Sequence, residues 1–198
     1  MNNLAASSNE VVSFENEQLI LVDEQDNEIG NLSKDRCHDG PGRLHRAFSL
    51  FIFDAQGRVL LQRRSAQKRL WPMYWSNTCC SHPRKGERMA DAVDRRLHQE
   101  LGLTSKPEFL FKFTYQAQYD ASGSEHELCW VYLGRSDDPV VVNANEIADW
   151  RFVSVEMLDR ELAEEPGKFT PWMKLEWRRI REEFGDKLQG FASVPENA

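Results

Sequence analysis

The sequence predicts an α+β fold in which helices flank a mixed β-sheet within a single domain. Two pairs of strand-like segments, 44–53 with 58–64 and 109–119 with 125–133, are each joined by a short polar turn, which is typical of hairpins. The segment 87–101 instead repeats its apolar residues with the helical period. The length of 198 residues suits one domain.

The composition excludes several classes of protein. Apolar residues are 40% and charged residues 29% of the chain, which is an ordinary globular balance. The net charge of −7 argues against nonspecific binding of nucleic acid, which needs a basic surface. No run of 18 apolar residues and no basic-then-apolar N-terminus is present, so we expect neither a membrane span nor a secretion signal. The four cysteines form no C-x-x-C pair and indicate reduced thiols in the cytoplasm.

The first third of the chain predicts four strands. Residues 1–17 are polar and lack periodicity, which indicates a flexible lead-in. Segments 19–22 and 29–32 are short strands around the turn DEQDNE, and the loop KDRCHDGPGR follows, rich in residues that break helices. The hairpin LHRAFSLFIF-DAQG-RVLLQRR completes this part.

The rest of the chain predicts both strands and helices. Segment 71–83 has no clear period and predicts a loop or distorted strand, and Gly102 ends the helix 87–101. The second hairpin turns at ASG. A strand at 150–153, a short acidic helix at 154–163 and a last helix then follow, the last with Thr170 as its N-cap and Pro171 in its first position. We expect one domain over 18–185 and a tail over 186–198.

A carboxylate lies on the apolar face of the helix 87–101. At 100° per residue, Val93 and Leu97 lie at the centre of the apolar stripe, Glu100 lies about 20° from Val93, and Arg96 lies at the edge. A buried carboxylate needs a partner. Two interpretations stay open: an internal Arg96–Glu100 pair, or a carboxylate directed at a divalent metal or phosphate.

The segment 81–103 resembles a degenerate Nudix box, G-x5-E-x7-REUxEExGU, in which U is apolar. The matching residues are Glu87, Arg95, Leu97, Glu100, Gly102 and Leu103. Ser81 replaces the glycine, and Arg96 and Gln99 replace two glutamates. The resemblance implies the α/β/α Nudix fold, whereas the missing acids weaken the case for a hydrolase.

Further reactive side chains gather in two short segments. In SNTCCSHP, an extended backbone would direct Cys80 and His82 to one face, although either residue taken alone is more often structural. Glu125 and Glu127 share a face of the second hairpin for the same reason, where a solvated edge is the alternative. If the turn centres near 121–122, Tyr119 opposes Glu125 and Tyr115 lies further along that face.

Three imidazoles and two carboxylates are therefore available for a metal. His38 and His45 bracket the loop Gly-Pro-Gly, and their spacing alone is a weak signal. Combined with His82, Glu125 and Glu127, they form a mixed nitrogen and oxygen set that suits zinc, manganese or magnesium.

Taken together, these motifs are similar to the type I isopentenyl-diphosphate delta-isomerases, a Nudix-fold family. The correspondence runs from about residue 19 to 184 and keeps the order of RLHRAFS, RR-x4-K, SNTCCSHP, RRLHQELG, E-x-E and TPWM. The resemblance implies interconversion of isopentenyl and dimethylallyl diphosphate in isoprenoid biosynthesis, by alkene protonation and C2 deprotonation. A Nudix hydrolase of a nucleoside diphosphate derivative and a catalytically silent binding module are the rival hypotheses.

The resemblance also implies roles for matching residues. Cys80 would be the catalytic thiol, with a pKa near neutrality, and Glu127, assisted by Tyr115, the catalytic acid. One divalent ion, Mn²⁺, Zn²⁺ or Mg²⁺, would bind His38, His45, His82, Glu125 and Glu127. A Mg²⁺ ion accompanying the diphosphate would bind Glu100, with Cys80 as a further metal ligand. The substrate would contact Lys34, Arg64, Lys68, Arg96 and Trp172. We expect a cytoplasmic monomer or weak dimer.

Overall fold

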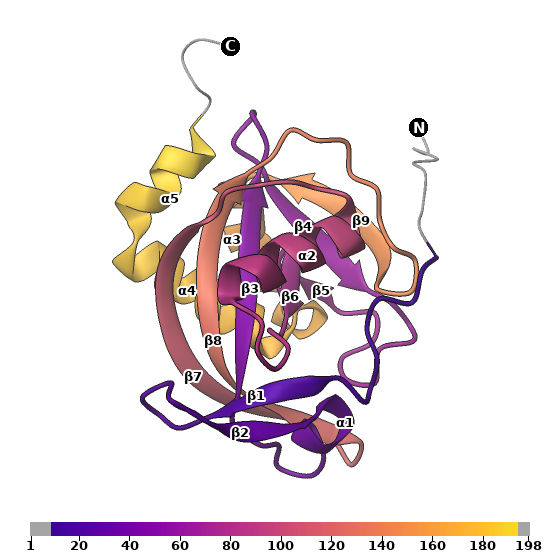
Figure 1. Ribbon diagram of the computed structural model, residues 1–198. Helices are drawn as coiled ribbons and strands as arrows, with labels where there is room; N and C mark the ends of the chain where they lie inside the picture. The colour runs from indigo at the N-terminus through magenta and orange to yellow at the C-terminus, as the bar shows by residue number, and fades with distance from the viewer. Residues whose placement is uncertain (1–8, 194–198) are drawn as a thin grey trace.

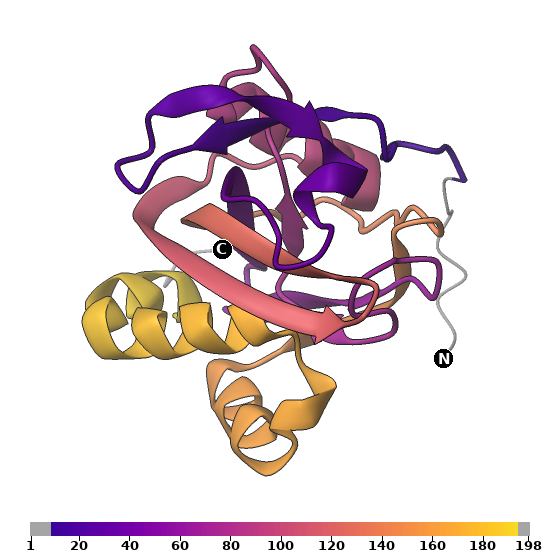
Figure 2. The same cartoon turned by 90° about the horizontal axis from the view of Figure 1, so that it is seen from below.

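The computed structural model describes residues 9–193, which form a β-sheet between two helical layers (Figures 1 and 2). Helix α2 covers one face of the sheet, and α3, α4 and α5 lie on the other. This confirms the predicted fold class. The strands are β1 (Gln18–Val22), β2 (Glu28–Ser33), β3 (His45–Phe53), β4 (Val59–Arg64), β5 (Trp75–Ser76), β6 (Cys79–Ser81), β7 (Glu108–Asp120), β8 (Gly123–Arg135) and β9 (Ile147–Val153). The helices are α1 (Lys34–Cys37), α2 (Met89–Leu101), α3 (Val155–Glu164), the 3-10 turn η1 (Pro166–Lys168), α4 (Pro171–Glu183) and α5 (Gly185–Ala192).

Strand β3 is the centre of the sheet. It runs parallel to β8 over nine residue pairs and pairs antiparallel with β1, β4 and β6. Because side chains alternate along a strand, Phe48 and Leu50 pack towards α2, whereas Phe51 and Phe53 pack towards α4 and α5. A strand that is buried on both faces needs an almost continuous apolar run, and FSLFIF supplies it.

The second hairpin, β7–β8, turns at the predicted residues but in a different register. Tyr115 lies opposite Glu127, and Ala117 lies opposite Glu125. The prediction that Tyr119 opposes Glu125 was wrong by two residues. A turn centred between residues 121 and 122 would place Gln118 opposite Glu125, and a bulge between Gln118 and Asp120 shifts the pairing by one residue more, to Ala117. The displaced Tyr119 ring packs instead against Trp71, with the ring centroids 5.1 Å apart.

The helix boundaries follow the predicted signals with one exception. Gly102 ends α2 in the left-handed conformation, at φ 68°. The Ser154 hydroxyl caps α3 by accepting a hydrogen bond from the backbone N–H of Met157. Thr170 precedes α4 as expected but makes no capping bond, because its hydroxyl pairs with that of Ser76 at 3.0 Å.

Both predicted terminal segments contain more order than the sequence indicated. The tail predicted over 186–198 begins instead with α5, where the Phe191 ring packs on Phe53 and the carbonyl of Gly190 accepts a bond from Arg135. In the predicted N-terminal lead-in, residues 9–17 lie along the molecule with Val12 buried. The rest of both predicted segments, 1–8 and 194–198, lies outside the described residues.

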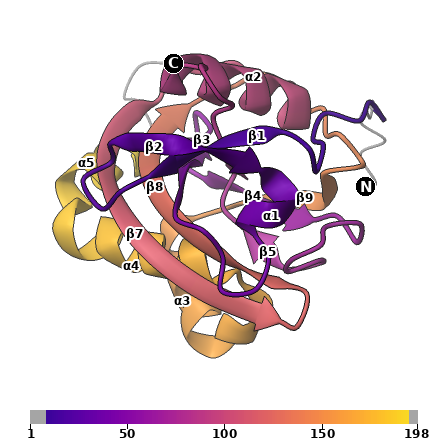
Figure 3. The same cartoon turned by 60° about the horizontal axis from the view of Figure 1, so that its bottom comes forward.

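The β1–β2 hairpin and α1 cross the end of the sheet where β3 begins (Figure 3). Leu21 of β1 pairs with His45, the first residue of β3. Helix α1 occupies the first part of the predicted loop and ends at Cys37, immediately before His38. The backbone carbonyl of His38 then accepts a hydrogen bond from Ser124 at the start of β8. These contacts bring α1, β3 and β8 together at one end of the sheet.

Candidate active site

A cavity of about 220 Å³ opens at this end of the sheet. It contains both proposed reactive residues, Cys80 and Glu127, together with Tyr115 and Trp172. Five lysine and arginine side chains line the same cavity, namely Lys34, Arg64, Lys68, Arg69 and Arg96. The cavity therefore combines an acid, a thiol, an aromatic wall and a cationic end.

The five predicted metal ligands converge beside this cavity. Each side chain offers one ligand atom, and these atoms lie within 4.8 Å of one another. They come from the segment after α1 (His38), from β3 (His45), from the residue after β6 (His82) and from β8 (Glu125 and Glu127). Glu125 and Glu127 share a face because they are two residues apart in one strand. Cys80, which the resemblance added to the ligands, is not part of this group.

The imidazole orientations fit a metal site. The Nδ1 atoms of His38 and His45 lie 2.6 and 2.7 Å from the carbonyls of Lys34 and Arg43. Since a carbonyl can only accept, Nδ1 of each ring carries a proton, and Nε2 is the nitrogen directed into the cluster, where it could offer its lone pair to a metal. The buried His45 Nε2 has no hydrogen-bond partner among residues 9–193. An unpaired, buried imidazole nitrogen among carboxylates is the arrangement that a divalent ion would satisfy.

Charge is distributed unequally over the two glutamates. Burial and the neighbouring Glu125 raise the pKa of Glu127 to about 7. Burial opposes ionisation of Glu125, but His38, at 2.9 Å, outweighs it and lowers the pKa of Glu125. Glu127 also accepts hydrogen bonds from Tyr115 Oη at 2.6 Å and from His82 Nε2 at 2.8 Å. One carboxyl of the pair is thus ionised, while the other can hold a proton near neutral pH.

The thiol of Cys80 is surrounded by polar groups. It donates to Asn77 Oδ1 at 2.8 Å, lies 3.3 Å from Ser49 Oγ, and accepts from Trp172 Nε1 at 3.1 Å. Burial, followed by repulsion from Glu176, raises the pKa of Cys80 well above its ordinary value. The near-neutral thiol pKa expected for a cationic or metal-rich site is therefore not found in this structure, because burial disfavours the thiolate.

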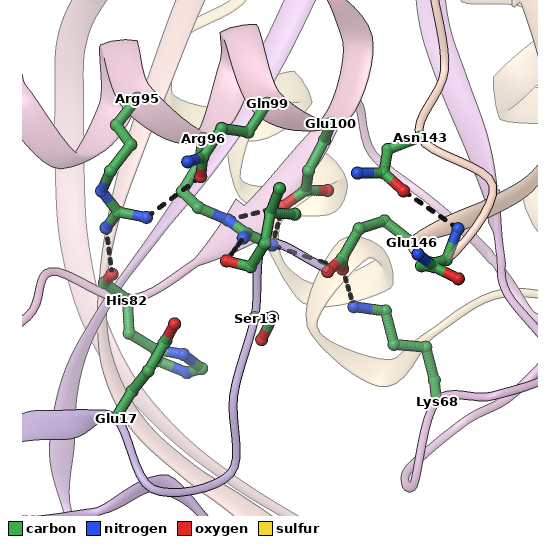
Figure 4. Close-up of polar contacts among 12 residues, drawn as sticks. Ser13, Glu17, Lys68, His82, Arg95, Arg96, Gln99, Glu100, Asn143 and Glu146 are labelled. Carbon is green, nitrogen blue, oxygen red and sulfur yellow. Dashed lines mark hydrogen bonds and ion pairs between the residues drawn. The ribbon is translucent and has the colours of Figure 1, made fainter. Parts of the chain in front are cut away.

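The cationic end is organised around Arg96 (Figure 4). Its guanidinium bonds Glu100 through Nε at 2.9 Å and Nη2 at 2.5 Å, and Nη2 lies 3.3 Å from Glu146. Lys68 bonds Glu146 from the opposite side. The internal Arg96–Glu100 pair, one of the two interpretations left open by the helical wheel, is thus present in this structure. Glu100 does not line the cavity.

The N-terminal segment closes one side of the cationic end. The carbonyl of Val12 accepts from Arg96 Nη1 at 2.8 Å, and the Ser13 hydroxyl accepts from Lys34 Nζ at 2.6 Å. Asn143 and Asn145 hold this segment through the carbonyls of Glu10 and Asn9. In this structure, the segment 9–13 therefore accepts hydrogen bonds from Arg96 and Lys34, two side chains that the family resemblance predicted to bind the diphosphate.

Comparisons with known proteins point to one family. The family model for the NUDIX domain matches residues 43–173. The isopentenyl-diphosphate Delta-isomerase 1 of Photorhabdus laumondii is 41% identical over 174 residues, which are 87% of this chain and 99% of that protein. The isopentenyl-diphosphate Delta-isomerase of Burkholderia multivorans is 44% identical over 79% of this chain and 88% of its own length.

The chain belongs to the Nudix isopentenyl-diphosphate Delta-isomerases. A solved structure of DR0079 from Deinococcus radiodurans has the same Nudix fold, with a TM-score of 0.64 and 25% identity over 82% of this chain and 98% of that one. Among residues 9–193, no helix is long and apolar enough to span a membrane.

Sequence reasoning missed four residues of this isomerase-family site. Ser49 and Asn77 contact the Cys80 thiol, and Glu146 joins Lys68 to Arg96. Glu176 of α4 is fully buried beside Cys129. The first three carry no distinctive spacing. Glu176, however, lies in the apolar stripe of α4 with Trp172, Met173, Trp177 and Ile180, so the helical wheel that singled out Glu100 would have found it too.

Proposed function

We propose that this protein interconverts isopentenyl diphosphate and dimethylallyl diphosphate, with Glu127 as the acid and Cys80 as the base. The observation that carries the proposal is the cavity itself, which presents Glu127, Cys80 and five lysine and arginine side chains to one small ligand. The identity to named isomerases over most of the chain supports the same activity. The basic end would bind the diphosphate, and the five-carbon chain would extend between the acid and the thiol.

Glu127 would begin the reaction by transferring its proton to C4 of the substrate. The electron pair of the C3=C4 bond forms the new C4–H bond, which leaves a tertiary cation at C3. The pKa of Glu127, raised to about 7 by burial and by Glu125, keeps a proton available at neutral pH. After transfer, the carboxylate accepts hydrogen bonds from Tyr115 and His82.

Cys80 would complete the reaction by removing a proton from C2. The C2–H electron pair becomes the C2=C3 bond, and the proton forms an S–H bond. The thiolate is the reactive form, and burial raises the pKa of this thiol, so the sulfur needs hydrogen-bond donors. Trp172 Nε1–H supplies one at 3.1 Å. The enzyme is left with a carboxylate and a thiol and resets by exchanging one proton between them through solvent.

The aromatic wall would protect the cation. Water would capture a tertiary cation, so the site must exclude it, and the Trp172 ring is buried among other side chains. The guanidinium of Arg64 already lies 5.2 Å from the centre of this ring. A desolvated ring face stabilises a cation by up to about 2 kcal/mol.

The residues present fit a divalent ion at the His and Glu cluster. Bound there, Mn²⁺, Zn²⁺ or Mg²⁺ would withdraw charge from Glu127, and a Mg²⁺ ion held by Glu100 would neutralise the diphosphate. Glu100 would have to release Arg96, to which it is bonded in this structure. The freed guanidinium would then be available to a phosphate oxygen.

Incubation with isopentenyl diphosphate and Mg²⁺ in deuterated water, followed by proton NMR, tests the function. Dimethylallyl diphosphate containing deuterium is the expected product. Release of inorganic phosphate without isomer would overturn the proposal and would indicate a hydrolase, the activity expected of a helix that carries the full set of Nudix acids. An unchanged substrate would indicate a binding module and would also overturn it.

We also propose that the enzyme works in the cytoplasm as a monomer or weak dimer. The four cysteines are all free, which suits a reducing compartment. Sedimentation velocity over a range of protein concentrations tests the oligomeric state.

A further inference from the structure

Glu146 is a buried carboxylate at the cationic end of the cavity, and the reaction above does not use it. It is 3% exposed and lines the cavity together with Lys68 and Arg96, two of the side chains proposed to bind the diphosphate. Its Oε2 atom accepts from Lys68 Nζ and lies 3.3 Å from Arg96 Nη2 (Figure 4). A negative group therefore lies where a negative ligand is expected to bind.

The backbone holds Glu146 in this position. Its N–H donates to the carbonyl of Asn143 at 3.0 Å, and its carbonyl accepts from the N–H of Ser65 at 2.9 Å. The carbonyl of Ser65 also accepts from the N–H of Lys68 at 3.2 Å, so the residue after β4 fixes the backbone of both partners. The carboxylate therefore remains beside the cationic end when a ligand enters.

Glu146 belongs to a group of four charges that balance one another. Burial opposes the ionisation of Glu146, but Lys68 and Arg96 outweigh burial and lower the pKa of Glu146 to about 2. Arg96 also contacts a second buried carboxylate, Glu100, through Nε at 2.9 Å. Two cations and two carboxylates thus form a chain of ion pairs without net charge, Lys68–Glu146–Arg96–Glu100.

The remaining cations of the cavity do not balance a diphosphate. Arg69 pairs with Asp39, which leaves Lys34 and Arg64 to supply positive charge to a ligand. A diphosphate carries roughly three negative charges at neutral pH, more than these two side chains can balance. A divalent cation that arrives with the diphosphate supplies the missing positive charge.

We propose that Glu146 is a specificity-determining residue, which makes this end of the cavity bind a diphosphate complexed with a divalent cation in preference to the free anion. Its carboxylate repels an uncomplexed phosphate oxygen at short range and attracts the divalent cation of the complex. Repulsion of the wrong ligand is a general means of specificity. The inference rests on the proposed function, in which this end of the cavity binds the diphosphate.

Isothermal titration calorimetry with inorganic pyrophosphate, in buffers that contain either Mg²⁺ or EDTA, tests the proposal. The measured quantity is the Mg²⁺ preference, defined as the Kd in EDTA divided by the Kd in Mg²⁺. Glu146→Gln keeps the size of the side chain and removes its charge, so the preference should fall roughly 10- to 100-fold, mainly because the Kd in EDTA decreases. Variant and wild type are compared in the same buffer, so removal of an ion from the His and Glu cluster affects both proteins.

Two further variants separate the charge of Glu146 from its packing. Glu146→Asp keeps the charge, so its Mg²⁺ preference should stay within about 3-fold of wild type. The matched control is Glu15→Gln, which removes a carboxylate that also lines the cavity and lies 3.7 Å from Lys34, but is 59% exposed. Because solvent screens that charge, the preference should change by less than about 5-fold. Thermal unfolding shows whether each variant is folded.

An unchanged Mg²⁺ preference in Glu146→Gln would overturn the proposal. Equal losses in Glu146→Asp or in Glu15→Gln would also contradict it, because packing or overall charge would then explain the effect. A wild-type protein that binds pyrophosphate equally well in both buffers would exclude it without any variant. In each of these cases, the conversion of isopentenyl diphosphate would persist. Absence of pyrophosphate binding in both buffers would refute the diphosphate site itself, so the two failures are distinguishable.

Discussion

The adjacent residues Cys79 and Cys80 lie on opposite faces of β6, so one packs in the core and the other lines the cavity. Cys79 points towards α2 and packs in the apolar cluster around Phe48 and Leu97. Cys80 points to the opposite face, into the cavity with Trp172. Because side chains alternate along β6, the two cysteines point to opposite faces of the sheet. Within SNTCCSHP, only the position of His82, two residues after Cys80, indicates which cysteine faces the site.

At this scale, we predict that Cys80→Ser and Glu127→Gln each lower kcat by about 10²–10⁴-fold, since each removes a group that exchanges a proton with the substrate. Steady-state kinetics with isopentenyl diphosphate measures the loss. The control is Cys79→Ala, which changes the neighbouring thiol on the other face and should retain kcat. A rate near that of wild type in either active-site variant would exclude the role assigned to that residue.

At the scale of the element, α2 carries its charged pair inside the apolar stripe. Arg96 and Glu100 are 3% and 2% exposed, and Glu146 completes the group from the segment before β9. The helical wheel identified the Arg96–Glu100 pair, but it did not show whether the two residues form a structural ion pair or bind a ligand. Only the positions of Glu146 and of the Val12 carbonyl show that all three nitrogens of the Arg96 guanidinium have partners in this structure.

We therefore predict that Arg96→Ala both raises KM and destabilises the protein. It leaves Glu100 and Glu146 without their shared cation, which should lower the free energy of unfolding by about 3–5 kcal/mol. Urea denaturation measures this loss, and Arg96→Met combined with Glu100→Gln should recover part of it. A KM that is unchanged in Arg96→Ala would contradict the assigned phosphate contact.

Helix α4 contributes a pH dependence of stability. The pKa of Glu176 is about 8 in the folded protein, against an ordinary value of 4.5, so between these pH values the folded state binds more protons than the unfolded chain. The free energy of unfolding must then fall as the pH rises through this interval. Glu176→Gln removes the contribution.

We predict that Glu176→Gln becomes more stable relative to wild type by about 2–4 kcal/mol when the pH rises from 5 to 8. Urea unfolding of both proteins at the two pH values gives the difference, and Glu183→Gln serves as the exposed control on the same helix. A difference that does not change with pH would show that Glu176 is ionised in the folded protein throughout.

At the scale of the whole molecule, the five-residue cluster joins segments that are far apart in the sequence. His38 follows α1, His45 begins β3, His82 follows β6, and Glu125 and Glu127 lie in β8. The parallel pairing of β3 with β8 places His45 directly beside Glu127. A bound ion would therefore stabilise the tertiary arrangement rather than a single element.

We predict that a divalent ion raises the melting temperature of the protein after treatment with a chelator. At 100 times its Kd, an ion that binds only the folded state adds about 2.7 kcal/mol, equivalent to about 5–10 °C for a chain of this length. Thermal unfolding with and without Mn²⁺ or Zn²⁺ measures the shift. It should disappear in His45→Asn and persist in His98→Asn, an exposed histidine of α2. No shift in wild type would exclude a tight site.

Periodicity and motifs along the chain predicted most of the elements and the residue types of the site, although not the helices α1 and α5. Periodicity located the central strand, the two hairpins and α2, and the motif order indicated the family together with Cys80, Glu127 and the five metal ligands. These features are local, because each depends on the pattern of residues within about 20 positions along the chain. The fold class follows from the order of the elements that these patterns predict. The same wheel, applied to α4, would have added Glu176.

Which groups share a proton or a charge depends instead on contacts between segments that are distant in the sequence. The bulge in β7 placed Tyr115 opposite Glu127, and burial made Cys80 a weaker acid than its motif indicated. Ser49, Glu146 and Glu176 joined the site through pairings between strands and helices that are distant in sequence. The free energy of a buried charge depends on all its neighbours in space, and no pattern along the chain specifies these.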